Sequence, residues 1–578
     1  MNTLAIVGVV TTLLVAAPTA AEGDRSGAAH DRTRTGSMRV LTDEDLHADK
    51  RPRVGDTVML SDFARCYPRS AISTKSIKGK WWLRPYRAAS GQTGHMLCVE
   101  ERDRDSPQSA IALPLTYKVD LEGVYDIWVG TYRAIHYGGV DIKLTRDKAY
   151  GPIQPAFEDG VDGWPPAPEK LSRIIECFYT TADLTGQNFH LRQPRGTYNG
   201  VWWGFAQSHI AYIKLIRRDS ADVAREVAEK TTQERKGVMI DRDGGSYFYE
   251  WGTNTIDCII QQFEEFRYGN IESINWCVGA GTDIDVPHPL GTPRSSGHGG
   301  RLGDQRRYQV LKNFRDNGID HLHVVVDRCR EIGLKIFFSH RIGKRKNYGD
   351  TEERDLYRDF LLYLAENYDI DGLTIDFTRH PPFFTQPISQ QQQFECINDY
   401  LRQLRSGLDR VGQAKGRHLD LNASFETGVF YRGFRTAESN GLDVQTWIDE
   451  GIVDCIMPEG RQVEKYIDMC RDKGVKCYPR RGAGMTFDGA AVNRNQTGDP
   501  TPADNYQDRP AEADYTSHEI AAGVLKWYDA GADGVFLFNY QYGHTPLRHL
   551  PYPQLMRKEV ESGETFGRRV GEKIEWLK

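Results

Sequence analysis

The sequence of 578 residues lacks the short motifs that mark several large classes of enzyme. It has no phosphate-binding loop, no dinucleotide fingerprint and no nucleophile elbow of the Ser hydrolases. It also has no CxxC pair, and its His and Cys residues lack the spacing of metal ligands. These absences disfavour nucleotide-dependent, Ser-dependent and metal-dependent chemistry, and we expect no cofactor and no metal.

Strong charge of either sign is absent as well. The net charge of −6 is small for this length, so it predicts neither a nucleic-acid partner nor an anionic membrane surface. After residue 21 no apolar run approaches the roughly 20 residues that a bilayer span requires.

The 10 Cys residues lie mostly in helix-like and strand-like segments. We therefore expect buried thiols rather than a disulfide framework, with one or two bridges left open by export.

Residues 1–21 are typical of an export signal. Leu4–Ala17 is almost wholly apolar, and small residues suited to cleavage follow it. The segment before the apolar run carries no Lys or Arg, which departs from the usual pattern. The alternative is a membrane anchor, but the run is shorter than a bilayer span. We expect a secreted or periplasmic protein that leaves the membrane once the signal is removed.

The texture of the chain predicts two domains after a polar leader. Residues 22–53 are charged and without periodicity, so we expect a flexible leader there. Residues 54–220 contain short alternating runs, such as 117–121 and 124–129, which predict an antiparallel β-sandwich. A linker helix is predicted over 221–235 and a second domain over 236–560. Residues 561–578 are expected to form a C-terminal tail.

In the second domain, strand-like and helix-like segments alternate, which is typical of a parallel sheet covered by helices. Three joints repeat one pattern, in which a helix-like segment ends, a Gly follows and an apolar strand begins; they contain Gly333, Gly474 and Gly531. We count eight such units in roughly 300 residues, which predicts a (β/α)8 barrel. The expected fold class is therefore α/β, a barrel preceded by an antiparallel sandwich.

Three predicted strands of this domain end in an acidic residue. Asp376, Glu426 and Glu459 stand at the ends of the fourth, fifth and sixth strands. Since the strands of such a barrel end at one face, we expect the three acids to meet there. One acid at a strand end is more often a helix cap or a partner for Arg, but three at one face favour a functional site.

Three segments of the second domain resemble a known family. The segments 368–381, 441–454 and 531–540 resemble the bacterial barrels called glycosyl hydrolase-like family ten. The resemblance covers about residues 236–545, whereas the first domain resembles only the general galactose-binding-like sandwich. It implies a (β/α)8 fold and hydrolysis of glycosidic bonds by paired acids, with a nucleophile at the end of the fourth strand.

Glycoside hydrolysis needs one ionised and one protonated carboxyl group beside the same bond. We predict Asp376 as the nucleophile and Glu426 as the general acid/base, because neighbouring strands lie about 4.8 Å apart and retention requires carboxyls about 5–5.5 Å apart. Glu459 is the alternative acid, in which case Glu426 becomes a substrate ligand. Asp241 ends the first strand, where it either binds a sugar hydroxyl or caps a loop.

Residues after other strands complete the predicted substrate site. Its members are Asp241, Trp276, His340, Arg341, Arg379, His380, Arg461, Arg481, Asn539 and Tyr540. The cations among them, with Arg480 beside them, either bind a sulfated or uronic glycan or pair with the acids of the site. Trp276 either stacks on a sugar ring or fills the barrel.

The sequence thus predicts an exported glycoside hydrolase that cleaves a polysaccharide or oligosaccharide with retention, and an anionic glycan is one option for its substrate. Two alternatives stay open. One is a glycan-binding protein without catalysis on the same scaffold. The other is a metal-dependent carbohydrate deacetylase. The sugar, its linkage and the oligomeric state do not follow from the sequence.

Overall fold

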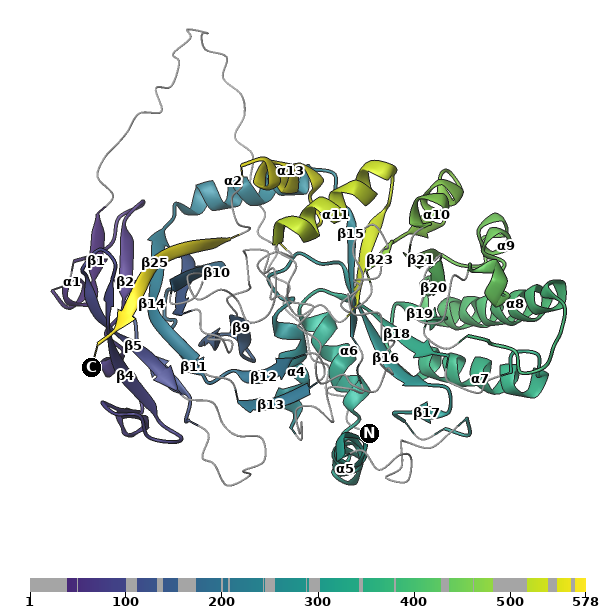
Figure 1. Cartoon of the computed structure of the whole chain (residues 1–578), viewed down its shortest axis with the longest axis horizontal. Helices are drawn as coiled ribbons and strands as arrows, with labels where there is room; N and C mark the ends of the chain where they lie inside the picture. Colours follow the sequence, from purple (N-terminus) through teal and green to yellow (C-terminus); the bar gives the residue numbers. More distant parts are fainter. Residues whose placement is uncertain are drawn as a thin grey trace, which may run out of the picture. The chain divides into compact units, whose positions relative to one another are not determined.

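The computed structural model describes the chain in segments (Figure 1). The described residues are 39–48, 50–99, 112–132, 139–153, 173–198, 201–205, 208–242, 244, 255–286, 288–290, 302–342, 347–378, 381–427, 436–460, 462–481, 517–538, 548–562 and 567–577.

Three sheets formed mainly by antiparallel pairs contain the strands that precede the parallel sheet in the chain, together with one strand from the C-terminal end. The largest contains β1 (Val40–Thr42), β2 (Thr57–Leu60), β3 (Ile72–Ser73), β4 (Trp81–Ala88), β5 (Thr93–Val99), β7 (Val124–Tyr132), β10 (Arg173–Asp183), β14 (Ser208–Arg217) and β25 (Arg568–Trp576). A second contains β6 (Leu115–Tyr117), β11 (Phe189–Arg192), β8 (Val140–Leu144) and β9 (Gly151–Ile153). β12 (Arg195–Tyr198) and β13 (Val201–Phe205) form a separate pair.

Six strands of the largest sheet pair in a closed order. β7 pairs with both β10 and β14, so β14, β5, β4, β25, β10 and β7 follow one another in a closed order of pairings. One apolar cluster joins this sheet to the second, through residues such as Ile127 and Leu191. Another cluster, with Tyr86, Met96 and Ile574, uses different side chains of the same strands. The sequence predicts an antiparallel β-sandwich for this part of the chain, and the pairings within the largest sheet are antiparallel apart from β1 with β2 and β3 with β4.

Both ends of the first domain extend beyond the predicted boundaries. β1 and α1 (Asp43–His47) lie within residues 22–53, which we expected to be a flexible leader. Asp43 holds them in place, because its carboxylate accepts hydrogen bonds from the backbone N–H groups of Ser61 and Asp62. β25 lies within residues 561–578, the expected tail, and pairs with β4 and β10. The C-terminal segment therefore supplies a strand inside the largest sheet.

The second half of the chain forms the predicted parallel sheet. Its strands are β15 (Gly237–Arg242), β16 (Ser273–Ala280), β18 (Lys335–Arg341), β19 (Gly372–Asp376), β20 (Asp420–Thr427), β21 (Cys455–Gly460), β22 (Lys476–Cys477), β23 (Arg480–Arg481) and β24 (Gly534–Phe538), with β17 (Asp283–Ile284) antiparallel to β16. The pairing order runs from β22 through β21, β20, β19, β18, β16, β15 and β24 to β23.

The seventh predicted strand joins the two ends of that order. Tyr478 and Pro479 separate β22 from β23. The N–H of Tyr478 donates to Ile456 O on β21 at 2.9 Å, and the N–H of Phe536 on β24 donates to Pro479 O at 3.0 Å. The same short segment therefore bonds to the strands on both sides of it.

Helices alternate with these strands as the sequence pattern predicts. They are α2 (Ser220–Thr231), in the predicted linker, and then α4 (Ile256–Glu264), α5 (Leu302–Asp316), α6 (His321–Glu331), α7 (Thr351–Asn367), α8 (Gln390–Lys415), α9 (Val444–Asp449), α10 (Val463–Cys470), α11 (Ser517–Ala530) and α13 (Pro553–Ser562). α5 is an additional helix that the sequence pattern did not indicate. α5 is rich in polar residues, among them Arg306, Lys312 and Arg315. The apolar periodicity that would predict a helix is therefore weak there.

The three predicted helix-to-strand joints have the expected backbone. Gly333, Gly474 and Gly531 have φ of 75°, 78° and 105°, the left-handed region that a residue other than Gly rarely adopts. After Gly333, Leu334 closes the end of α6 by donating its N–H to the carbonyl of Cys329 at 2.8 Å.

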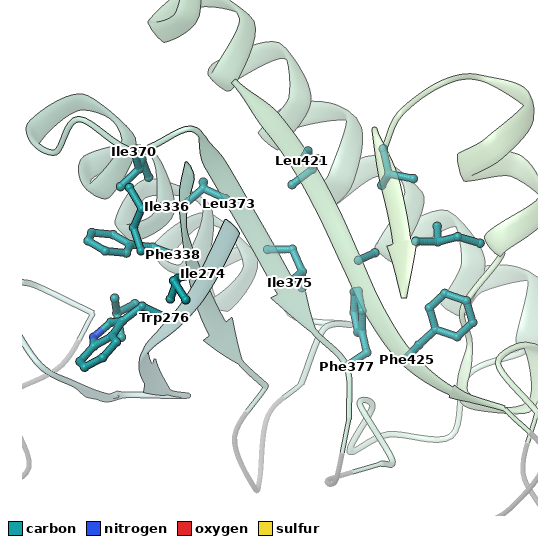
Figure 2. Close-up of a cluster of buried hydrophobic side chains, with 14 of the residues drawn as sticks. Ile274, Trp276, Ile336, Phe338, Ile370, Leu373, Ile375, Phe377, Leu421 and Phe425 are labelled. Carbon is teal, nitrogen blue, oxygen red and sulfur yellow. The ribbon is translucent and has the colours of Figure 1, made fainter. Parts of the chain in front are cut away.

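One face of each parallel strand packs against the helices. Figure 2 shows Trp276, Phe338, Ile375 and Phe425 in one buried apolar cluster with further side chains of these strands. The same cluster includes helix residues such as Trp447. Because side chains alternate along a strand, the residues between these ones lie on the other face. None of the helices in the described part of the chain is long and apolar enough to cross a membrane.

Replacing Ile574 with Ala tests whether β25 completes the largest sheet in solution. Ile574 is 5% exposed and packs in the cluster with Tyr86 and Met96, so we expect a loss of about 2–5 kcal/mol in the free energy of unfolding. Ile77, at 47% exposed, provides the control, and Ile77→Ala should change stability by at most about 0.5 kcal/mol. Equal urea midpoints for the two variants would contradict the assigned place of β25.

Candidate active site

The face of the parallel sheet that does not pack against the helices becomes polar and charged toward the carboxyl ends of the strands. We call it the site face. It carries Asp241, Asp376, Glu426 and Glu459, which are 1–6% exposed. Strand register brings them together, because Asp376 pairs with Ser424 and Glu426 pairs with Glu459. Register partners on parallel strands point to the same side of the sheet.

Asp376 is an ion-paired carboxylate at the end of β19. Its Oδ2 accepts from Arg341 Nε at 2.8 Å, and its Oδ1 accepts from Arg480 Nη1 at 3.1 Å. Thr378 adds two bonds to Oδ1, from its hydroxyl at 2.6 Å and its N–H at 3.1 Å. Burial acts to raise the pKa of Asp376, but the charges of Arg480 and Arg341 and the bond from Thr378 outweigh it and hold the pKa well below its usual range. Asp376 is therefore an anion throughout the physiological range.

Arg480 is the cation shared by the acids of the site. Besides Asp376, its guanidinium meets Glu459 Oε2 at 3.0 Å through Nε, and Asp241 Oδ2 at 4.0 Å through Nη2. Its Nη1 also donates to Ser424 Oγ at 2.7 Å. The side chain is 2% exposed. One buried guanidinium thus fixes side chains from β15, β19, β20 and β21 relative to one another.

Asp241 differs from Asp376 in its surroundings. Its Oδ1 accepts from Asn275 Nδ2 at 2.6 Å, whereas its buried Oδ2 has no hydrogen-bond donor among the described residues. Burial raises the pKa of Asp241 to about 6, against the opposing charges of Arg480 and Arg341, and the negative charge of Asp376 adds to the rise. Two acids of one cluster therefore have pKa values displaced in opposite directions, which is typical of functional sites.

Three residues predicted to bind substrate lie away from the acids. Trp276 packs on Phe263 of α4, with ring centroids 5.4 Å apart, and belongs to the core between the sheet and the helices. His340 Nε2 lies 2.9 Å from Gly281 O, and its ring contacts α7. Arg481 pairs in register with Leu537 of that core, whereas Arg480 pairs with Phe536 of the site face. The alternation of side chains places all three on the helix side of the sheet.

Five further predicted site residues lie outside the described residues: Arg379, His380, Arg461, Asn539 and Tyr540. Arg341 lies in the site, but its Nε binds Asp376. Of the two roles that the sequence left open for Arg341, pairing with an acid of the site is the one that its contact fits.

Several polar residues of the site had no place among the predicted site residues. The sequence groups Arg480 with the cations after the seventh strand but predicts Arg481, and not Arg480, as a substrate-binding residue. Thr378, Ser424 and Asn275 were not singled out. Their signal is the two-residue period: Ser424 precedes Glu426 by two positions, and Thr378 follows Asp376 by two.

One group in the described residues has metal-like proximity, namely His418, Asp420 and Asp454. It lies at the amino ends of β20 and β21, away from the ends that carry Glu426 and Glu459. Asp454 already accepts from Arg405 at 2.8 Å and from the N–H of Leu421 at 2.7 Å. These contacts give the group a structural role, in which Asp454 joins the start of β21 to β20 and α8.

Comparison with known proteins gives distant structural likenesses only. No family model matches the chain, and no curated protein matches its sequence. Chitinase ChiW from Paenibacillus sp. strain FPU-7 is 9% identical, with a TM-score of 0.37, over 77% of this chain and 43% of its own. A family 18 N-acetylglucosaminidase from Paenibacillus barengoltzii is 13% identical, with a TM-score of 0.32, over 55% and 98%. A GH113 β-1,4-mannanase is 13% identical, with a TM-score of 0.31, over 57% and 100%. Likenesses of this size assign no activity to the chain.

Replacing Arg480 with Met should leave buried carboxylates without their shared cation. We expect a loss of about 3–5 kcal/mol in the free energy of unfolding at pH 7. The depressed pKa of Asp376 means that its ion pairs stabilise the fold above the unfolded-state pKa and cease to do so as pH falls. The deficit of Arg480→Met, measured by urea unfolding, should therefore persist down to about pH 4 and shrink as pH falls further.

The matched control is Arg402→Met. Arg402 pairs with Glu450 at 2.7 Å, but both side chains are nearly half exposed, so the expected cost is at most about 1 kcal/mol. A cost for Arg480→Met no larger than this, or one that does not vary with pH, would show that Arg480 does not hold the acids together.

Proposed function

We propose that the chain is a glycoside hydrolase whose site lies at the carboxyl ends of β15 and β18–β24. The observation that carries the proposal is the cluster of three buried acids around Arg480, namely Asp241, Asp376 and Glu459, with the buried Glu426 beside Glu459 in register. Glycoside hydrolysis requires carboxyl groups held in different protonation states beside one bond, and such a cluster can supply them. We also infer that the parallel sheet closes as an eight-stranded barrel, which the bonds of Tyr478 and Pro479 to β21 and β24 support.

We assign the nucleophile to Asp376. It is held ionised, as a nucleophile must be, and Oδ1 is occupied by donors from Thr378 and Arg480. Oδ2 accepts from Arg341 alone among the described residues, so it is the oxygen with a lone pair left for the anomeric carbon. Arg341 and Thr378 would fix the direction of attack.

We assign the general acid/base to Glu426 in preference to Glu459. A general acid must enter the reaction with a proton, and Glu459 is salt-bridged to Arg480 at 3.0 Å. Glu426 comes from β20, the strand next to Asp376, and lies two residues beyond Ser424, the register partner of Asp376. We propose retention because neighbouring strands, about 4.8 Å apart, can bring two carboxyls to the roughly 5–5.5 Å that it requires.

Export and an anionic substrate are further parts of the proposal. Export rests on the apolar run at the start of the chain. The preference for a sulfated or uronic glycan rests on Arg379 and Arg461, which follow the fourth and sixth predicted strands in the sequence, because Arg341 and Arg480 are bound to the acids.

Replacing Asp376 with Asn tests the nucleophile. We expect turnover of a screened polysaccharide to fall by about 10⁴-fold or more, while binding to the same glycan changes little. Circular dichroism and the unfolding midpoint check that the fold survives the weaker contact with Arg341. Turnover within tenfold of the wild-type rate would exclude Asp376 as the nucleophile, and binding without product by the wild-type protein would favour a glycan-binding protein.

The pair Glu426→Gln and Glu459→Gln tests the acid. A leaving group that departs without a proton needs no acid, so loss of the true acid should spare aryl glycosides with activated leaving groups. We expect Glu426→Gln to lose at least about 100-fold in kcat/KM on natural glycan and much less on the activated glycoside. Glu459→Gln should lose similar factors on both. The reverse pattern would move the acid role to Glu459.

A further inference from the structure

Three carboxyl groups of the site converge on a single guanidinium. Arg480 lies 3.1 Å from Asp376, 3.0 Å from Glu459 and 4.0 Å from Asp241. Asp376 has a second cation, Arg341, and further hydrogen bonds from Thr378. Asp241 has the longest distance to Arg480, and no described residue donates to its buried Oδ2. If one of these acids carries a proton, the contacts favour Asp241, because its ionised form is the least stabilised of the three.

The charges that act most strongly on Asp241 come from three other strands of the sheet. The charged groups that act on it are Arg480 from β23, Arg341 from β18 and Asp376 from β19. Asn275 on β16 is uncharged, and the register partner on β24 is Phe538. The raised pKa of Asp241, about 6, agrees with this count.

We propose that Asp241 is a positioning residue that holds a proton in the active form of the site and thereby leaves Arg480 to Asp376 and Glu459. When Asp241 releases its proton to solvent, its Oδ2 becomes an anion 4.0 Å from Arg480 and competes for the guanidinium. The contacts of Arg480 with Asp376 and Glu459 then weaken, and the site loses its geometry above about pH 6. This role differs from binding a sugar hydroxyl, which the sequence left open for Asp241, and its effect on turnover depends on the proposed hydrolase function.

The first test needs no substrate, so it stands even if the hydrolase proposal fails. A carboxyl whose folded-state pKa is raised stabilises the fold below the unfolded-state pKa, and that contribution is lost as pH rises through the folded-state pKa. Asn resembles the protonated acid at every pH. The unfolding midpoint of Asp241→Asn minus that of the wild type should therefore rise by about 2–4 °C between pH 4 and pH 7.

Two outcomes of that test would overturn the proposal. A midpoint difference that falls with rising pH would make Asp241 an ion-paired anion, and a difference that does not vary with pH would mean that it does not titrate in this range. Should Asp241→Asn fail to fold, infrared difference spectra of the unmodified protein between pH 5 and pH 7 replace the variant. Loss of a carboxylic-acid band is expected, and no loss would contradict the proposal.

Asp420→Asn is the matched control for the unfolding midpoint and for the infrared spectrum. Burial and the charge of Asp454 raise the pKa of Asp420, but Asp420 begins β20 at the end of the sheet away from Glu426. Its variant should show the same sign of stability change without altering the pH dependence of activity. Burial also raises the pKa of Glu264 on α4, so Glu264→Gln is combined with Asp420→Asn, and the infrared change that remains in the double variant is assigned to the site.

The second test measures turnover. Wild-type kcat should fall above about pH 6, whereas Asp241→Asn should keep at least about a third of wild-type kcat at pH 5 and show no such fall. A variant that loses kcat 100-fold at every pH would make Asp241 an ionised catalytic base. A variant whose KM rises 10-fold or more at every pH with unchanged kcat would make it a substrate ligand. Either result overturns the positioning role.

Discussion

The buried guanidinium of Arg480 is the contact on which the geometry of the site depends. It bonds to Asp376 and Ser424 and meets Glu459 and Asp241, so it ties four strands of the parallel sheet together at one point. Its position follows from the short segment β22–β23, whose backbone bonds to β21 on one side and to β24 on the other. That segment therefore places Arg480 within reach of Asp241, Asp376 and Glu459.

The acids around Arg480 differ in charge because their surroundings differ. Asp376 has two guanidinium groups and a Thr hydroxyl and remains ionised, whereas Asp241 has an amide donor and a distant cation and holds its proton to about pH 6. A site built to hydrolyse a glycosidic bond needs this division between charged and neutral carboxyls. The surroundings thus hold neighbouring carboxyls of one site in different states, although two Asp side chains exposed to water would titrate alike. The proposed acid, Glu426, is a separate carboxyl of the same face.

The sequence predicted the parallel sheet well because periodicity and helix ends are local signals. Gly333, Gly474 and Gly531 marked real helix-to-strand joints, and Asp376, Glu426 and Glu459 lie on the site face. The errors of assignment concern single steps along a strand. Trp276 and His340 alternate with residues of the site face, and a shift of one position moves a side chain to the other side of the sheet.

Long-range pairing could not be predicted in the same way. β25 is rich in charged residues, and only its partners β4 and β10, hundreds of residues away, make Ile574 a core residue. Arg480 gave a similar difficulty, because its neighbour Arg481 has the same chemistry and only the register with Phe536 separates their roles. Contacts of this kind depend on tertiary structure, and local pattern carries no record of them.

Asp376 is the proposed nucleophile of a catalytic centre whose acids are held together by Arg480. The most direct measurement is mass spectrometry after reaction with a 2-deoxy-2-fluoro glycoside that carries an activated leaving group, using the sugar that the screen identifies. We expect one covalent sugar per chain, on the peptide that contains Asp376. Turnover of the natural glycan without any adduct, or an adduct on Glu426 or Glu459, would contradict it.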